Sequence, residues 1–263
     1  MGVLNATPDS FSDGALYLEA EKAVRRAWEI AEEGADILDI GGESTRPGSR
    51  PVSAGEELRR VLPVLERLGR KYPLPISIDT YKPEVAHAAL ECGAGLVNDV
   101  TGLREGSGLA SAAAAHGAAL IVVHMRGEPA TMQLQPPSND ILGEIDSWAD
   151  RAVATALSCG VSRDRIILDP GIGFGKTAGQ NLEILRNMER VSAIGFPLLV
   201  GTSRKSFIGA ILHKPPSERI WGTAAAVAAS IAFGAHVVRV HDVAAMREVA
   251  QVMDAIMVEG TSE

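Results

Sequence analysis

Short apolar runs alternate with amphipathic segments along the whole chain. In the amphipathic segments, apolar residues recur every three or four positions between charged ones, which is the spacing of one helix face. The clearest example begins with a capping box from Ser53 to Glu56 and continues through Val61, Leu65 and Leu68. The short apolar runs have the length of strands and end in turn-forming residues. They lie at Val3–Leu4, Ile37–Ile40, Ile76–Ile78, Leu96–Asn98, Ala119–His124, Ile166–Leu168, Leu198–Gly201 and Val237–Val240.

This alternation gives eight strand–helix units and therefore one fold class. Eight βα units in 263 residues predict a (β/α)8 barrel, or TIM barrel, that forms a single domain over residues 1–263. The longest irregular segments, 5–15, 41–52 and 127–138, all follow strands, so long loops are expected at the C-terminal rim, above all after strands 1 and 2. The predicted helices lie near 23–34, 53–68, Pro83–Cys92, Leu109–His116, Asn139–Cys159, Asn181–Ala193, Thr223–Phe233 and Val243–Met257.

Residues able to do chemistry stand at or just past the ends of successive predicted strands. Each of them alone could be a helix cap or a turn residue. In a barrel, however, Asp79 and Asp169 would face the same mouth, and paired carboxylates there suit acid–base chemistry or metal binding. The histidines are scattered, so a structural zinc site is not expected. The strand-end residues are Asn5, Asp39, Asp79, Asn98, His124, Asp169, Gly201 and His241.

The segment Asp169–Lys176 reads Asp-Pro-Gly-Ile-Gly-Phe-Gly-Lys and follows the sixth predicted strand. Three glycines in five residues indicate a backbone that bends sharply and approaches another group closely. A plain βα turn with Asp169 as a capping residue explains the same pattern. The segment lacks the spacing of a P-loop, and a dinucleotide fingerprint would belong to a first βα unit rather than a sixth.

Composition narrows the class of ligand. The chain carries 46% hydrophobic residues and a net charge of −8, so no general attraction to nucleic acid or to an anionic membrane is expected. No apolar run has the length of a membrane span and no signal peptide is recognisable. Two lone cysteines, Cys92 and Cys159, fit a reducing cytoplasmic location. An anionic substrate group is nevertheless expected, because the predicted rim gathers cationic side chains. They are Lys176, Arg204, Lys205, Arg239 and His241.

Two long segments carry a family resemblance. Residues 1–14, MGVLNATPDSFSDG, and residues 39–48, DIGGESTRPG, resemble the two signatures of the dihydropteroate synthases. Ala6 and Ala15 depart from the expected Val and Gly without removing a functional group. The resemblance implies a (β/α)8 barrel that joins 7,8-dihydropterin-6-ylmethyl diphosphate to 4-aminobenzoate in folate synthesis, with Mg2+ and as a homodimer. Further matching blocks are Ile78–Thr80, Asn98–Asp99, Asp169–Lys176, Ser203–Phe207 and Arg239–Asp242.

The resemblance also implies roles at the pterin. Asp169 would accept two adjacent N–H donors of the aminopyrimidinone ring, while Asn98 and Asp79 would bind its other edge. Lys205 would donate to the pterin oxygen or to a ring nitrogen. Arg204 would lie flat on the ring, since a planar guanidinium stacks better than an ammonium.

The other substrate groups are assigned in the same way. Phe174 and Ser206 would contact the arylamine, and for Phe174 a packing role at the rim is an equal alternative. Asn5 would be the single side-chain ligand of Mg2+, and Asp13 would lie in a loop that closes over the site. The diphosphate would be held by four residues. They are Thr45, Arg46, Arg239 and His241.

The implied chemistry is a largely dissociative substitution at the exocyclic methylene carbon of the pterin. Asp79 and Asp169 would favour the positive charge that develops there, with Lys205 and Asp13 completing the catalytic set. Two alternatives remain. A corrinoid-linked methyltransferase domain could use a similar barrel, although it would lack both loop signatures, and a non-catalytic homologue could bind pterin alone.

Overall fold

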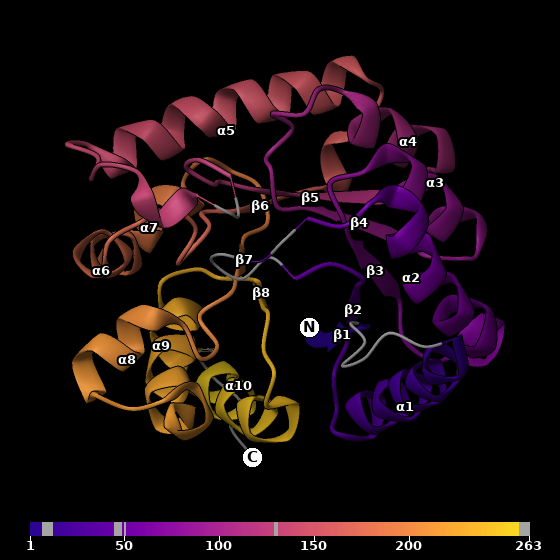
Figure 1. The fold of residues 1–263 in the computed structure, drawn as a ribbon. Coiled ribbons are helices and arrows are strands. Elements are labelled where there is room, and N and C mark those ends of the chain that lie inside the picture. Colours follow the sequence, from indigo (N-terminus) through magenta and orange to yellow (C-terminus); the bar gives the residue numbers. More distant parts are fainter. Residues whose placement is uncertain (7–12, 45–48, 50, 129–130, 258–263) are drawn as a thin grey trace.

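A computed structural model describes residues 1–6, 13–44, 49, 51–128 and 131–257, with the backbone alone at 13–18. Within this part of the chain the strands form a central barrel and the helices an outer ring (Figure 1). Six parallel strands pair in sequence order, and the last two pair with each other. The strands are β1 (Gly2–Asn5), β2 (Leu38–Gly41), β3 (Ile76–Asp79), β4 (Leu96–Asp99), β5 (Ala119–Val123), β6 (Ile166–Asp169), β7 (Leu199–Val200) and β8 (Val237–Val238).

Two parallel bridges close the barrel. One joins Leu168 of β6 to Leu198, the residue before β7, and the other joins Gly2 of β1 to Val240 just past β8. The Val3 N–H donates to the Val240 carbonyl at 3.1 Å, so the first and last strands are hydrogen-bonded. The predicted (β/α)8 barrel is therefore confirmed.

The helices follow the predicted pattern with three differences. α1 begins at Asp13, well before Ala23, where the apolar periodicity starts. Asp13 therefore starts a helix instead of lying in the loop predicted for it. The helix predicted over 181–193 divides at Asn187, and an additional short helix, α8, follows β7. The helices are α1 (Asp13–Glu32), α2 (Ala54–Leu68), α3 (Pro83–Glu91), α4 (Gly108–His116), α5 (Ile141–Ser158), α6 (Ala178–Arg186), α7 (Met188–Ser192), α8 (Ser206–Leu212), α9 (Ile220–Ala232) and α10 (Val243–Met257).

Strand alternation explains how polar residues reach the barrel mouth. Successive side chains of a strand point to opposite faces, so residues two apart share a face. Leu96 and Ile121 belong to an apolar cluster separate from the main core under the helices, whereas their neighbour Val97 packs in that main core. Asn98 shares the inward parity of Leu96 and lies one layer nearer the C-terminal end. The same step places the strand-end carboxylates above the apolar barrel interior.

Membrane insertion through a helix has no support in the described residues. None of the helices there combines the length and the apolar character that a membrane span requires.

Candidate active site

A buried ion cluster joins β2, β3, β4 and β8 at the barrel mouth. Arg239 donates through Nε to Asp39 Oδ2 at 2.6 Å and through Nη2 to Asp79 Oδ2 at 2.7 Å. The Asn98 amide Nδ2 donates to Asp39 Oδ2 at 3.2 Å. The side chains of Asp39, Asp79 and Asn98 are almost entirely inaccessible to water. Three consecutive strands and the residue that follows β8 thus share one hydrogen-bonded unit.

Three acceptor oxygens of this cluster are left without a partner. Among the described residues, Asp39 Oδ1, Asp79 Oδ1 and Asn98 Oδ1 are buried and have no hydrogen-bond partner. Burial raises the pKa of Asp79 well above its ordinary value, against the lowering effect of Arg239, while the neighbouring Asp39 raises it further. A buried acceptor without a partner is costly, so these three oxygens favour a ligand that brings N–H donors.

Asp169, the last residue of β6, supplies a second carboxylate at the mouth. Its Oδ1 accepts the Gly171 N–H at 2.7 Å. Burial raises the pKa of Asp169 to about 6, although the Gly171 hydrogen bond and Lys205 lower it. Burial also lowers the pKa of Lys205 to about 8, while Asp169 raises it. The Lys205 ammonium lies 4.1 Å from the centre of the Phe174 ring. It is therefore stabilised both by the aromatic face and by the charge of Asp169.

The glycine-rich loop after β6 is built as the sequence predicts. Gly171, Gly173 and Gly175 all have positive φ, at 68°, 85° and 67°. A Cβ atom on Gly171 would stand 1.9 Å from the carbonyl oxygen of His124, and one on Gly175 would stand 2.2 Å from that of Arg126. The loop therefore lies directly against the backbone that follows β5, and side chains larger than glycine are excluded there.

Lys176 does not serve as a cation at the rim, and the prediction that it contributes to an anionic substrate site is wrong. Its side chain is buried, and its ammonium donates to three backbone carbonyls. Nothing in the sequence pattern indicates this burial, because a lysine that follows a glycine-rich turn is typical of a surface loop.

On the β7–β8 side of the mouth, Arg204 has a left-handed backbone, with φ of 59°, and its Nε donates to Asp242 Oδ2 at 3.0 Å. His241 Nδ1 lies 3.0 Å from Ser203 Oγ. Ser206 is exposed at the first position of α8. These residues lie at the rim that was predicted for them. Stacking of Arg204 on a pterin remains a prediction.

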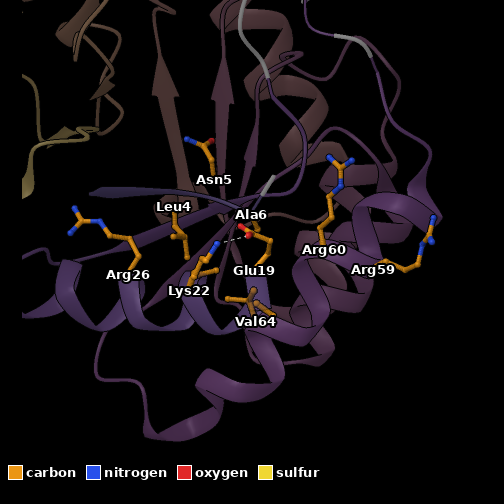
Figure 2. A pocket seen from close by; sticks show the side chains of 11 residues that line it. Leu4, Asn5, Ala6, Glu19, Lys22, Arg26, Arg59, Arg60 and Val64 are labelled. Atoms are coloured by element: carbon orange, nitrogen blue, oxygen red, sulfur yellow. Dashed lines mark hydrogen bonds and ion pairs between the residues drawn. The ribbon is translucent and has the colours of Figure 1, made fainter. Parts of the chain in front are cut away.

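Asn5 is exposed at the end of β1 and lines a cavity of about 180 Å³. In Figure 2 its side chain points away from the ion pair of Lys22 and Glu19 on α1. Thr45 and Arg46 lie outside the described residues, as does the side chain of Asp13. Within the described residues, no group of three or more His, Cys, Asp or Glu is arranged to hold a metal ion.

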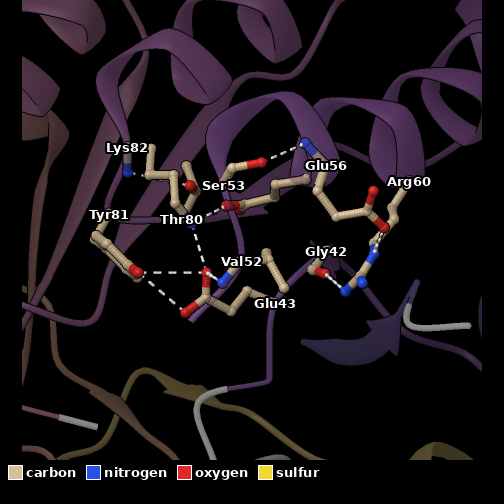
Figure 3. Close-up of polar contacts among 10 residues, drawn as sticks. Gly42, Glu43, Val52, Ser53, Glu56, Arg60, Thr80, Tyr81 and Lys82 are labelled. Atoms are coloured by element: carbon tan, nitrogen blue, oxygen red, sulfur yellow. Dashed lines mark hydrogen bonds and ion pairs between the residues drawn. The ribbon is translucent and has the colours of Figure 1, made fainter. Parts of the chain in front are cut away.

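The base of the loop after β2 is tied down by a second polar network (Figure 3). Tyr81 Oη donates to Glu43 Oε1 at 3.0 Å, and the Lys82 ammonium bridges Glu43 and the buried Glu57 of α2. The Val52 N–H also donates to Glu43 Oε2, at 3.3 Å. Glu43 therefore joins both ends of the loop that contains Thr45 and Arg46.

Two features of the site were not predicted from sequence. Asp39 was noted at a strand end without a role, although its parity with Asp79 was a signal that it faces the barrel interior. The network around Glu43 had no signal, because it depends on which loop and helix termini meet in space.

Comparison with known proteins places this geometry in a family. The pterin binding enzyme family matches residues 1–241. The dihydropteroate synthase of a Synechocystis strain is 49% identical over 257 residues, which cover 97% of this chain and 89% of the relative, and that of Bacillus subtilis is 45% identical over 99% and 89%. A Clostridium difficile dihydropteroate synthase crystallised in the presence of pteroic acid is 44% identical with a TM-score of 0.91, covering 98% of this chain and 95% of that one. The Xanthomonas albilineans enzyme with 4-aminobenzoic acid is 41% identical with a TM-score of 0.90, covering 99% and 93%. The chain belongs to the pterin binding enzyme family, as a member of its dihydropteroate synthase branch.

Proposed function

We propose that this protein is a transferase that condenses 7,8-dihydropterin-6-ylmethyl diphosphate with 4-aminobenzoate, giving 7,8-dihydropteroate and diphosphate for folate synthesis. The observation that carries the proposal is the set of buried acceptors at the mouth: Asp39, Asp79 and Asn98 each keep one oxygen without a partner, beside the carboxylate of Asp169. An aminopyrimidinone ring presents several N–H donors along its edges, so it complements such a set. The relatives named above are synthases of this class.

The pterin would bind with its polar edges toward the barrel interior. Asp169 accepts two adjacent N–H groups, Asn98 and Asp79 bind another edge, and Lys205 donates to the ring oxygen or a ring nitrogen. The placement of Lys205 against Phe174 supports this orientation, because an ammonium fixed over an aromatic ring cannot swing into solvent without losing that contact.

The charge of the site suits a dissociative substitution. Asp39 and Asp79 share one guanidinium, so their cluster retains negative charge when both are ionised, and Asp169 adds more. Departure of diphosphate leaves a cation conjugated with the pterin, and preorganised carboxylates stabilise that charge as it develops. The arylamine nitrogen then attacks the methylene carbon and loses a proton.

The remaining substrate groups would lie nearer the rim. Phe174 and Ser206 would contact the arylamine, and the N-terminus of α8 would favour its carboxylate. Arg239 keeps donors beyond the two that its ion pairs use, so it could reach the diphosphate together with His241. By family resemblance alone, we assign Thr45 and Arg46 to the diphosphate, and Asp13, the first residue of α1, to the catalytic set.

We further propose that Mg2+ accompanies the diphosphate. Asn5 is exposed at the C-terminal end of β1, and its carboxamide oxygen is a ligand type that suits this ion. A single carboxamide ligand would hold a bare ion weakly, so the ion would arrive with the diphosphate of the substrate. When bound, Mg2+ would neutralise part of the diphosphate charge.

A homodimer formed through the last helices is also proposed. A groove of about 550 Å³ lies on α6, α8 and α9 and is lined mainly by apolar side chains, among them Phe207 and Phe233. Ile211 and Trp221 nearby are 54% and 79% exposed.

Light scattering at micromolar concentration should give twice the chain mass, and Ile211→Asp should reduce the measured mass. Leu134→Asp, at a large exposed side chain on the loop after β5, should leave the mass unchanged; a wild-type monomer would contradict the proposal.

A single assay tests the function. Diphosphate release from the pterin substrate should require 4-aminobenzoate. Neither alternative predicts this result: a corrinoid-linked methyltransferase domain would release no diphosphate, and a non-catalytic homologue would bind the pterin without turnover. Absence of arylamine-dependent release by folded protein would overturn the proposal.

A further inference from the structure

The buried Lys176 links two neighbouring loops of the barrel through one ammonium. Its Nζ donates to the carbonyl of Gly171 at 2.8 Å, of His124 at 3.0 Å and of Phe174 at 3.2 Å. His124 follows β5, whereas Gly171 and Phe174 belong to the loop after β6. Three bonds use every N–H of an ammonium, so the protonated side chain is fully satisfied.

These carbonyls converge because the loop is pressed against the backbone of its neighbour. The contact is too close for a side chain at Gly171, as the 1.9 Å approach to the His124 oxygen shows. Carbonyl dipoles that point at one another repel unless a donor or a cation lies between them. Lys176 supplies that cation from within the loop itself.

The residues held by Lys176 are the ones that shape the site. Gly171 gives its carbonyl to Lys176 and its N–H to the carboxylate of Asp169. Phe174 gives its carbonyl to Lys176, and its ring lies under the ammonium of Lys205. Each of these two residues therefore joins Lys176 on one side to a substrate-facing group on the other.

We propose that Lys176 is a positioning residue whose ammonium acts as a built-in cation, holding the Gly171 and Phe174 carbonyls so that Asp169 and Phe174 stand ready for the substrates. This role rests on the proposed function. Lys176 touches no reacting atom; it acts through the backbone that carries Asp169 and Phe174.

The surroundings of Lys176 act on the pKa of its ammonium in both directions. Burial lowers the pKa of Lys176 to about 7, while Asp169 raises it. Lys205 and Arg126 lower it further, and Glu144 of α5 raises it. Conversely, Lys176 is one of the groups that lower the pKa of Asp169, along with the Gly171 hydrogen bond, Lys205 and Arg239. Removing the ammonium should therefore raise the pKa of Asp169.

Chemical rescue can test the proposal. Lys176→Ala removes three methylene groups and the ammonium, which propylammonium can replace. Calorimetric binding of 6-hydroxymethylpterin, a pterin without diphosphate, should weaken at least tenfold in this variant. The pH midpoint of that binding should also move upward. Added propylammonium should restore both properties with saturation, whereas tetramethylammonium, which has charge but no N–H donor, should restore neither.

Two further variants make the result specific. Lys176→Met fills the same space without donors, so it should show the loss but no rescue, and it replaces the alanine variant if that variant does not fold. Lys71→Ala, at an exposed lysine after α2, controls for general effects of ammonium salts. Wild-type binding and an unmoved midpoint in Lys176→Met, or a folded Lys176→Ala whose loss propylammonium cannot reverse, would overturn the role. Both readouts are independent of turnover, so failure of the proposed condensation, seen as no diphosphate release by wild type, is distinguished from failure of this proposal.

Discussion

The two carboxylate groups of the barrel mouth are held in different ways. The Arg239 cluster joins four strands by side-chain bonds, and its geometry depends on charge. Asp169 is held within one loop, where a backbone N–H and three left-handed glycines set its surroundings. Burial raises the pKa of both Asp79 and Asp169. In each group, a ligand that donates N–H bonds would therefore stabilise the ionised carboxylate.

This difference separates stability from binding in one region but not in the other. In the Arg239 cluster, the bonds that shape the site also connect the first and last thirds of the barrel. Around Asp169, the loop backbone and Lys176 maintain the shape, and the carboxylate itself is bonded to one N–H. Substitutions in the Arg239 cluster should therefore lower the free energy of unfolding. Substitution of Asp169 should weaken pterin binding and leave the fold intact.

The largest expected effect is that of Arg239→Met. It leaves Asp39 and Asp79 buried without their counter-charge, and breaking a buried ion pair from one side costs about 3–5 kcal/mol. Denaturant unfolding should report that decrease in the free energy of unfolding, and pterin binding should be lost with it.

The control is Arg247→Met, which removes an exposed ion pair with Asp36. Its stability should barely change, because exposed pairs contribute little. Equal stability of the two variants would mean that the buried cluster is not a structural connection.

Asp169→Asn should weaken binding while preserving the fold. One acceptor oxygen becomes an NH2 donor that faces the donors of the pterin, a mismatch of about 2–4 kcal/mol, or roughly 30- to 1000-fold in affinity. Calorimetric titration with a pterin that lacks the diphosphate measures the effect without turnover.

Asp99→Asn is the matched control at another strand end. Asp99 accepts from the N–H groups of Thr101 and Leu103 and from the Thr101 hydroxyl, so it serves its own turn. Stability should fall by about 1–3 kcal/mol, with pterin affinity kept in the folded protein. If Asp169→Asn behaves like Asp99→Asn, Asp169 is a turn residue and not the pterin anchor.

The sequence predicted the parts of this comparison that follow from local pattern. Eight apolar runs and the capped helix at Ser53 define the barrel, and strand-end parity brings Asp79, Asn98 and Asp169 to one mouth. The burial of Lys176 and the pairing of Asp39 with Arg239 could not be predicted in this way. Both depend on contacts between loops and strands that meet only when the barrel closes. The division of the predicted helix at Asn187, where φ is −115°, is not visible in the apolar periodicity either.

Asn5 tests whether the mouth has a third, metal-dependent part beyond both carboxylate groups. Asn5→Ala should weaken use of the diphosphate substrate by about tenfold or more, the scale of one well-placed polar contact. Binding of the pterin without diphosphate should hardly change, since no carboxylate is altered. Steady-state kinetics over a Mg2+ titration and calorimetry provide the two readings, and an equal loss in both would assign Asn5 a structural role.

The mildest test uses pH and changes no residue. The pKa of Asp169 is about 6, and only its ionised form accepts two N–H groups. Affinity for the pterin without diphosphate should therefore fall as pH drops through 6, approaching about tenfold per pH unit. Stability without ligand should carry the opposite contribution from Asp169. Its folded pKa lies above the unfolded value, so the contribution is present at low pH and is lost as pH rises through 6.

Asp169→Asn should abolish the part of the binding profile near pH 6 and retain any part that Asp79 contributes. A wild-type affinity that stays constant from pH 7.5 to 5 would mean that the pterin does not rely on the Asp169 carboxylate, and the loop after β6 would then be a scaffold for Lys205 and Phe174 alone.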